Sequence, residues 1–182
     1  MPFRRLWSRL VGQETPPQGL SAPVAPAPAY TPDPGVRIHL AAHDPAFPAK
    51  REAAIAALTA GIDSAALAEG FEAKPQSWAK TGPLGTVSLH IQRSRYGFDC
   101  EVNLCFAPVV GDAVGPWEEE GRIPLGWFYG DQPAPLIYLD IVDNPATLQN
   151  ALQALQIVAL PWLIAHLSDP QAAHRAPTHR GD

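Results

Sequence analysis

Four polar side chains on two alternating segments are the first candidates for chemistry in this sequence. His90 and Gln92 alternate with apolar residues in TVSLHIQRS, and Glu101 and Asn103 do so in DCEVNLCFA. An imidazole beside a carboxylate and amides suits general acid–base chemistry or weak metal binding. The same set is also typical of the solvated face of a sheet, where polar cross-strand pairs are common. A third alternating segment contains Asp140, which we expect to join this set from another strand.

Two further groups carry side chains that are suited to binding. Arg93 and Arg95 flank Ser94, and two guanidiniums at one turn favour a phosphate or carboxylate ligand, although a solvated loop tip is the simpler interpretation. Trp127 lies in the long Gly- and Pro-rich connection 108–135. A connection of this length is often functional, so Trp127 is either an interface anchor or part of the core.

The two cysteines do not form a redox or metal pair in our interpretation. Cys100 and Cys105 are five positions apart on one predicted strand, so their side chains leave opposite faces and cannot form a disulfide with each other. Two free thiols agree with a reducing compartment. The sequence also lacks a nucleophile elbow, an HExxH motif, a phosphate-binding glycine loop and a dinucleotide fingerprint. We therefore predict no catalytic residue, no metal and no cofactor.

The alternating segments predict a β-hairpin that positions the polar side chains. A two-residue turn at Tyr96-Gly97 places residues that are equally far before and after the turn opposite each other. His90 then lies opposite Asn103, and Gln92 lies opposite Glu101. The same register pairs the apolar residues: Ile91 with Val102, Leu89 with Leu104, and Val87 with Phe106. This one register places polar residues opposite polar residues on one face and apolar residues opposite apolar residues on the other, as a half-buried antiparallel pair of strands requires.

Helices and further strands are predicted on either side of this hairpin. Helical periodicity covers residues 48–69, and a second helix begins at Asn144-Pro145 and must kink or break at Pro161. Shorter strands are expected at residues 36–40, 77–80, 123–129 and 136–143. The predicted fold class is α+β: an antiparallel sheet of about four to five strands with two helices packed on one face.

Short motifs in this region resemble a bacterial protein family. These motifs are Gly70-Phe71, Gln92 with Ser94, Asn103, and the closing stretch Ala159-Leu160-Pro161-Trp162. Over residues 48–168 the chain is similar to the domain of unknown function 4304 family. The resemblance implies an α+β fold and carries no known activity.

The N-terminal part of the chain differs in character from the predicted domain. Residues 1–12 form a basic amphipathic peptide whose apolar and arginine side chains suit an anchor: Phe3, Arg4, Arg5, Leu6, Trp7 and Leu10. Residues 13–35 contain seven prolines and are predicted to be a semi-rigid linker. The α+β domain then covers residues 36–168, and residues 169–182 are predicted to be a disordered tail.

Charge and composition narrow the class of protein. The formal net charge is −5, and residues 50–168 carry thirteen acidic and seven basic side chains, which argues against nucleic-acid binding. The N-terminus lacks an uninterrupted apolar stretch of a signal peptide, so we expect a cytoplasmic protein, with a membrane surface as a second contact through residues 1–12.

Three functions remain open from the sequence. The first is a non-enzymatic protein-binding or adaptor module that is tethered through its N-terminal peptide. The second is a small hydrolase or ligand-binding enzyme that uses the polar face around His90. The third is an immunity-type inhibitor whose acidic loop, the connection 108–135 with the triplet Glu118-Glu119-Glu120, covers a basic partner protein.

Overall fold

An antiparallel sheet with helices on one face organises the chain. The computed structural model describes residues 33–109, 122–128 and 135–172. The sheet has six strands in the order β1-β2-β3-β4-β5, with β6 paired to β4 as well. The strands are β1 (Glu72–Lys74), β2 (Ser77–Gly82), β3 (Gly85–Arg93), β4 (Asp99–Pro108), β5 (Arg122–Pro124) and β6 (Leu136–Ile137). The predicted α+β class is confirmed.

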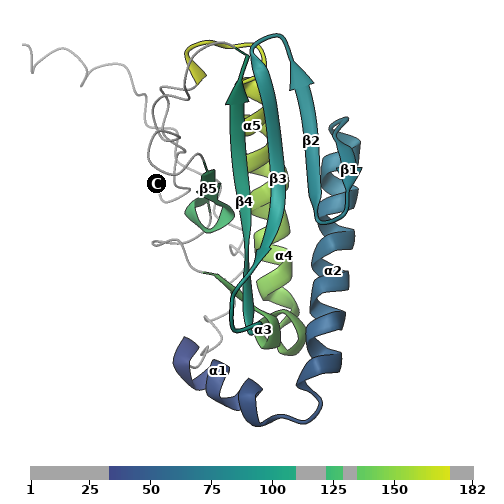
Figure 1. Ribbon diagram of the computed structural model, residues 1–182, viewed down its shortest axis with the longest axis vertical. Coiled ribbons are helices and arrows are strands. Elements are labelled where there is room, and N and C mark those ends of the chain that lie inside the picture. The colour runs from purple at the N-terminus through teal and green to yellow at the C-terminus, as the bar shows by residue number, and fades with distance from the viewer. Residues whose placement is uncertain (1–32, 110–121, 129–134, 173–182) are drawn as a thin grey trace, which may run out of the picture. The chain divides into compact units, whose positions relative to one another are not determined.

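The helices are α1 (Pro34–His43), α2 (Phe47–Ala68), α3 (Tyr138–Asp143), α4 (Pro145–Ala154) and α5 (Leu160–Ala165). Helices α2, α4 and α5 lie behind the sheet in the view of Figure 1, and α1 and α3 lie at its lower end, so that no described helix covers the other face of β2, β3 and β4. A 3-10 turn, η2 (Leu125–Phe128), follows β5, and a π-helical turn, η3 (Leu155–Ala159), joins α4 to α5. Helix α2 matches the predicted helix 48–69, and β2 contains the predicted strand 77–80.

The predicted hairpin register is confirmed along β3 and β4. His90 pairs with Asn103, and Leu89 pairs with Leu104. The connection is longer than the predicted two-residue turn, because β3 ends at Arg93 and β4 begins at Asp99. Within this connection the amide of Gly97 donates to the carbonyl of Ser94 at 3.1 Å. Gly97 has a φ of 72°, a backbone conformation that glycine adopts without steric cost.

Two of the predicted strands are wrong. Residues 36–40 belong to α1, because Asp33 caps the helix by accepting the Gly35 amide at 2.8 Å and Pro34 starts it. Residues 136–143 form only the two-residue strand β6 before α3 begins at Tyr138. The alternation in this segment is misleading, because Asp140, which we expect on a polar face, is buried, and so is its neighbour Tyr138 on the same side of the alternation.

The predicted strand 123–129 and the predicted break at Pro161 are each correct in part. Strand β5 covers Arg122–Pro124, and the chain then turns into η2. The second helix continues through Pro161, and the π-helical turn η3 directly precedes it. A proline has no N–H to donate, so a change in the hydrogen-bond pattern one turn earlier accommodates it.

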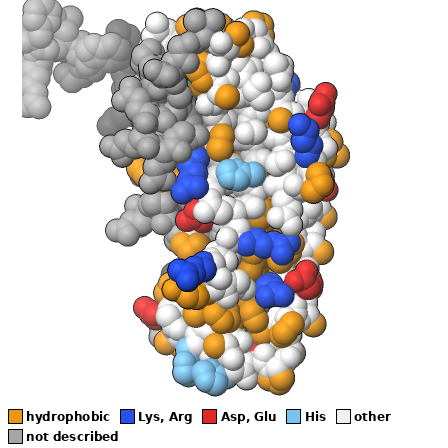
Figure 2. All heavy atoms as spheres, in the orientation of Figure 1, with side chains coloured by type: hydrophobic (Ala, Val, Ile, Leu, Met, Phe, Trp, Pro, Cys, Tyr) orange, Lys and Arg blue, Asp and Glu red, His pale blue; other side chains and the backbone are white. Residues whose placement is uncertain are grey.

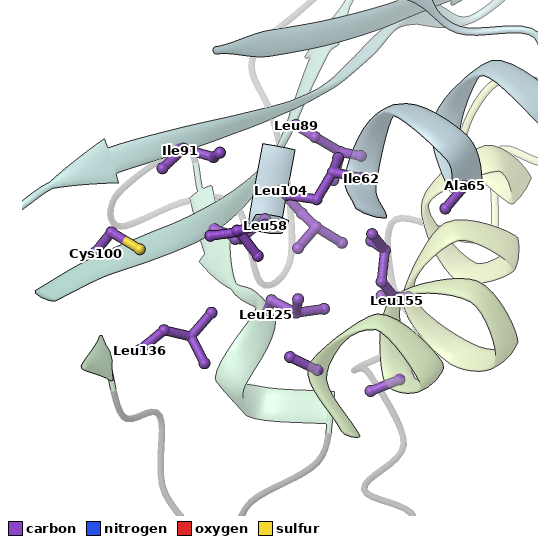
Figure 3. Close-up of a cluster of buried hydrophobic side chains, with 14 of the residues drawn as sticks. Leu58, Ile62, Ala65, Leu89, Ile91, Cys100, Leu104, Leu125, Leu136 and Leu155 are labelled. Carbon is purple, nitrogen blue, oxygen red and sulfur yellow. The ribbon is translucent and has the colours of Figure 1, made fainter. Parts of the chain in front are cut away.

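The core lies between the sheet and the helices α2 and α4–α5 (Figure 3). Leu58 and Ile62 from α2 meet Leu89 from β3, Leu104 from β4 and Leu155 from η3, and all five are fully buried. Each such side chain contributes about 1.5–3 kcal/mol through burial. The helical run Pro145–Ala165 is also long and apolar enough to cross a membrane by length and composition alone. Its residues Leu155, Leu160 and Leu163 are buried in the fold, as in a core helix.

Polar contacts fix the positions of two helices. Trp78 on β2 is 1% exposed, and its indole Nε1 donates to Oδ1 of Asp63 on α2 at 2.5 Å. Arg37 on α1 donates through Nε to Asp140 at 2.6 Å and through Nη2 to Asp143 at 2.7 Å. Burial works against the charged form of Arg37, but the hydrogen bonds to the two carboxylates outweigh it and raise the pKa of the guanidinium. These contacts hold α2 to the sheet and α1 to α3.

Candidate functional site

The face of the sheet that the helices leave free carries a group of polar side chains, which we call the open-face cluster. Strand register and alternation place its members on the same face of three neighbouring strands. Figure 2 shows this face, with histidine, lysine and arginine side chains lying over the strands. The members of the cluster are Ser88, His90, Gln92, Glu101, Asn103, Cys105 and Arg122.

Gln92 connects two other members of the cluster. Its side-chain oxygen Oε1 accepts from Nδ2 of Asn103 at 3.0 Å and from Nη1 of Arg122 at 2.8 Å. Gln92 is itself exposed, so its Nε2 group keeps its two N–H donors available to solvent or to a partner. Strands β3, β4 and β5 each contribute one residue to this contact, which ties the short strand β5 to the hairpin.

Asn103 is the most unusual member of the cluster. It is 0% exposed, and its side-chain oxygen Oδ1 is buried without a hydrogen-bond partner. A buried acceptor that lacks a donor costs about 1–3 kcal/mol. The fold therefore carries an unused polar group below the free face of the sheet, next to the exposed amide of Gln92.

His90 is half-buried next to these two amides. Desolvation lowers the pKa of its imidazole, and the positive charge of Arg122 lowers it further. The ring makes no hydrogen bond to any of the described residues. A neutral imidazole offers one donor and one acceptor, so His90 adds to the hydrogen-bonding groups of this face.

The structure brings together four of the predicted site residues and separates the others. His90, Gln92, Glu101 and Asn103 share the open face, as predicted. The expectation that Asp140 joins them is wrong, because it belongs to α3, where it binds Arg37. The acid–base interpretation thereby loses one of its two carboxylates.

The remaining predicted residues lie in other parts of the fold. Ser94 accepts the Gly97 amide through its hydroxyl at 3.2 Å, so it acts as a turn residue. Arg95 is exposed in the same loop, and Trp127 is 41% exposed in η2. The anchor residues of the N-terminal peptide and the acidic triplet 118–120 lie outside the described residues.

Sequence reasoning missed Arg122. This residue pairs with Cys105 in the ladder between β4 and β5, and its guanidinium reaches Gln92. The predicted strand began one residue later, at position 123, and a local pattern gives no information on which distant strand it pairs with. The available signal was the alternation of Arg122, Ile123 and Pro124, in which only Ile123 is buried.

Both cysteines are free thiols on opposite faces of β4, as predicted. Cys100 faces the core, where desolvation raises the pKa of its thiol to about 12. Cys105 faces the open side, and desolvation raises its pKa as well, although a hydrogen bond with Ser88 opposes the shift. Neither thiol is activated as a nucleophile.

One hollow among the described residues is too small for a substrate. A hollow between β4, η2 and β6 is lined by Cys100, Glu101, Val102, Pro124 and Leu136, among others, and has no room for a water-sized sphere. Within ranges 33–109, 122–128 and 135–172, no three histidine, cysteine, aspartate or glutamate side chains are grouped so as to hold a metal ion. What the open face offers is a set of hydrogen-bonding groups at its surface.

Comparisons with known proteins identify no relative. No family model, no curated protein and no solved structure matches this chain. The resemblance to the domain of unknown function 4304 family therefore stays a prediction from the motifs quoted above.

Proposed function

We propose that this chain is a non-enzymatic protein-binding module that contacts its partner through the open-face cluster. The observation that supports this proposal most directly is Asn103, because a fully buried acceptor without a donor is a cost that a free-standing fold has no reason to keep. Natural proteins carry such costs at sites where function requires them.

The chemistry of the cluster favours a polypeptide as the ligand. The face combines an unpaired carbonyl oxygen on Asn103, free amide N–H groups on Gln92 and the imidazole of His90. Neighbouring donors and acceptors of this kind match the N–H and C=O groups of a peptide or of a side-chain amide. Gln92, whose side chain accepts from Nδ2 of Asn103, is the exposed member of the cluster beside this group.

Site-specific photo-crosslinking in the full chain tests this proposal. A photoreactive amino acid replaces Gln92 in one variant and Ala57, an exposed residue on the helical layer, in the matched control. We expect the Gln92 variant to capture a defined protein from extracts of the source cells, and the Ala57 variant not to capture it. Equal capture at both positions, or capture at neither, would contradict the proposal.

A second set of variants separates binding from folding. Asn103→Leu removes the unpaired acceptor, so we expect equal or higher thermal stability together with at least about tenfold weaker binding of the captured partner, which corresponds to about 1.4 kcal/mol. Thr81→Ala, at the far end of β2, is the control that leaves binding unchanged. If Asn103→Leu binds the partner normally, then the open-face cluster is not the contact surface.

A further inference from the structure

A second group of ligating side chains lies on α1, away from the open-face cluster. His39 and His43 are four positions apart on this helix, and both are exposed. Side chains at this spacing lie on the same face of a helix, one turn apart. Their ring centroids are 4.4 Å apart, with a tilt of 43° between the ring planes. From this arrangement we propose that the two histidines form a bidentate site for a late first-row divalent metal ion such as Ni²⁺, Cu²⁺ or Zn²⁺.

A backbone hydrogen bond already selects the ligand atom on one of the two rings. Nδ1 of His43 lies 2.8 Å from the carbonyl oxygen of His39. A carbonyl oxygen only accepts, so Nδ1 carries the proton and the lone pair of the neutral ring is on Nε2. Histidine ligands in metal sites are commonly oriented by such a bond to a backbone carbonyl. His43 is therefore preorganised to bind an ion through Nε2.

The second ring is close enough to complete the pair. The ring nitrogens of His39 make no hydrogen bond to any described residue, so both remain available. Two nitrogens that each lie about 2.0–2.1 Å from one ion are roughly 3 Å apart. Neighbouring rings with centroids 4.4 Å apart reach this separation by small side-chain rotations. Water fills the remaining coordination positions at this exposed site.

The electrostatics of this end of the molecule favour a cation. His43 is the last residue of α1, where the unpaired carbonyl groups of a helix end carry partial negative charge. The nearest fixed cation on α1, Arg37, is already paired with two carboxylates, Asp140 and Asp143. Lys50 is likewise paired with Asp44 at 2.9 Å. Imidazole nitrogens prefer copper, nickel and zinc to the hard ions magnesium and calcium.

Titration of the full chain with Ni²⁺, followed by isothermal calorimetry, tests the proposal, because this ion does not oxidise the thiols. We expect one Ni²⁺ per chain at the strongest site, and at least a tenfold loss of affinity in H39Q/H43Q. The variant H39Q/A42H keeps the number of histidines but places them at adjacent positions on different faces of α1, so it must show the same loss. The variant H174Q/H179Q, which removes two other histidines of the chain, is the control that keeps the affinity.

Nuclear magnetic resonance spectra locate the ion independently of these variants. Substoichiometric Ni²⁺ is paramagnetic when bound by imidazoles and water, so we expect line broadening confined to α1 and its neighbours. Unchanged amide shifts of α1 in the metal-free variants establish that the helix still forms. Wild-type affinity in H39Q/H43Q or in H39Q/A42H, or broadening centred outside α1, would overturn the proposal.

Discussion

The hydrogen bond between Trp78 and Asp63 gives the most direct quantitative test of how the sheet is held to the helices. Trp78 is 1% exposed, and its only polar atom, Nε1, donates to the Asp63 carboxylate. Asp63→Ala leaves this N–H buried without an acceptor, which costs about 2 kcal/mol. Alanine favours the helix by about 0.5 kcal/mol relative to aspartate, so the expected net loss is about 1.5 kcal/mol.

This loss is measurable by thermal unfolding followed by circular dichroism. The compact unit Pro32–Asp182 is of a size for which 1 kcal/mol shifts the melting temperature by about 2–4 °C, so we expect a decrease of about 3–6 °C. Asp63→Asn keeps an acceptor and should lose about half as much. Ser64→Ala, at the exposed neighbouring position, measures the gain in helix propensity alone and should raise the melting temperature slightly.

A double-mutant cycle then assigns the effect to the contact. In a Trp78→Phe background there is no N–H to satisfy, so Asp63→Ala should cost less than about 0.5 kcal/mol. If Asp63→Ala destabilises the protein equally in both backgrounds, the loss comes from elsewhere in α2 and the reasoning fails. If it has no effect in the wild-type background, the indole finds another acceptor.

Three further predictions follow from contacts described above or from close packing. At Gly82 an added Cβ would lie 2.7 Å from Cβ of Leu167 and 3.1 Å from the Leu167 carbonyl oxygen. Gly82→Ala should therefore lower the free energy of unfolding, measured in urea, by about 1–3 kcal/mol. An unchanged urea midpoint would contradict this prediction. Arg37→Met removes the partner of buried Asp140, so the amides of α1 should exchange hydrogen at least about tenfold faster, while those of β3 stay protected. The pKa of His90 is lower in the folded protein than in the unfolded chain, so the unfolded state binds more protons near pH 6, and acidification from pH 7 destabilises the protein. His90→Gln should therefore reduce the dependence of the unfolding free energy on pH. An unchanged slope of that free energy against pH would contradict this prediction.

The hairpin was predictable because its information is local. Apolar and polar residues alternate in both strands, and only one register places Ile91 opposite Val102 while also placing His90 opposite Asn103. The polar pairs of the open face follow from that register. The contacts of Gln92 with Arg122, and the unpaired oxygen of Asn103, depend on how β5 packs beside β4, which no local pattern encodes.

The two wrong strands show where alternation stops being informative. In α3 the four consecutive residues Tyr138–Ile141 are all buried, so this short helix shows no helical alternation of apolar and polar residues, and its sequence is compatible with either period. In α1 the residues Asp33 and Pro34 are typical of the start of a helix, whereas the short apolar alternation of residues 36–40 is typical of a strand, and the helix is what forms. The long-range pairing of Arg37 with Asp140 joins these two segments, and no local pattern in either segment predicts it.

The π-helical turn η3 changes the phase of the helical hydrophobic pattern. In a regular α-helix each residue advances by about 100°, so one additional residue would rotate everything that follows it by that angle. A π-helical turn holds the additional residue within a wider turn and so avoids this rotation. Leu155 at the start of this turn and Leu160 and Leu163 after it are all buried in the same core. Deleting exposed Ile157 would place Leu155 and Leu160 at i and i+4, and Leu155 and Leu163 at i and i+7, so a regular α-helix would then keep all three on the core side. The π turn therefore compensates for one additional residue, much as a second frameshift restores a reading frame, and loss of one residue should be tolerated better at this turn than elsewhere in the helix.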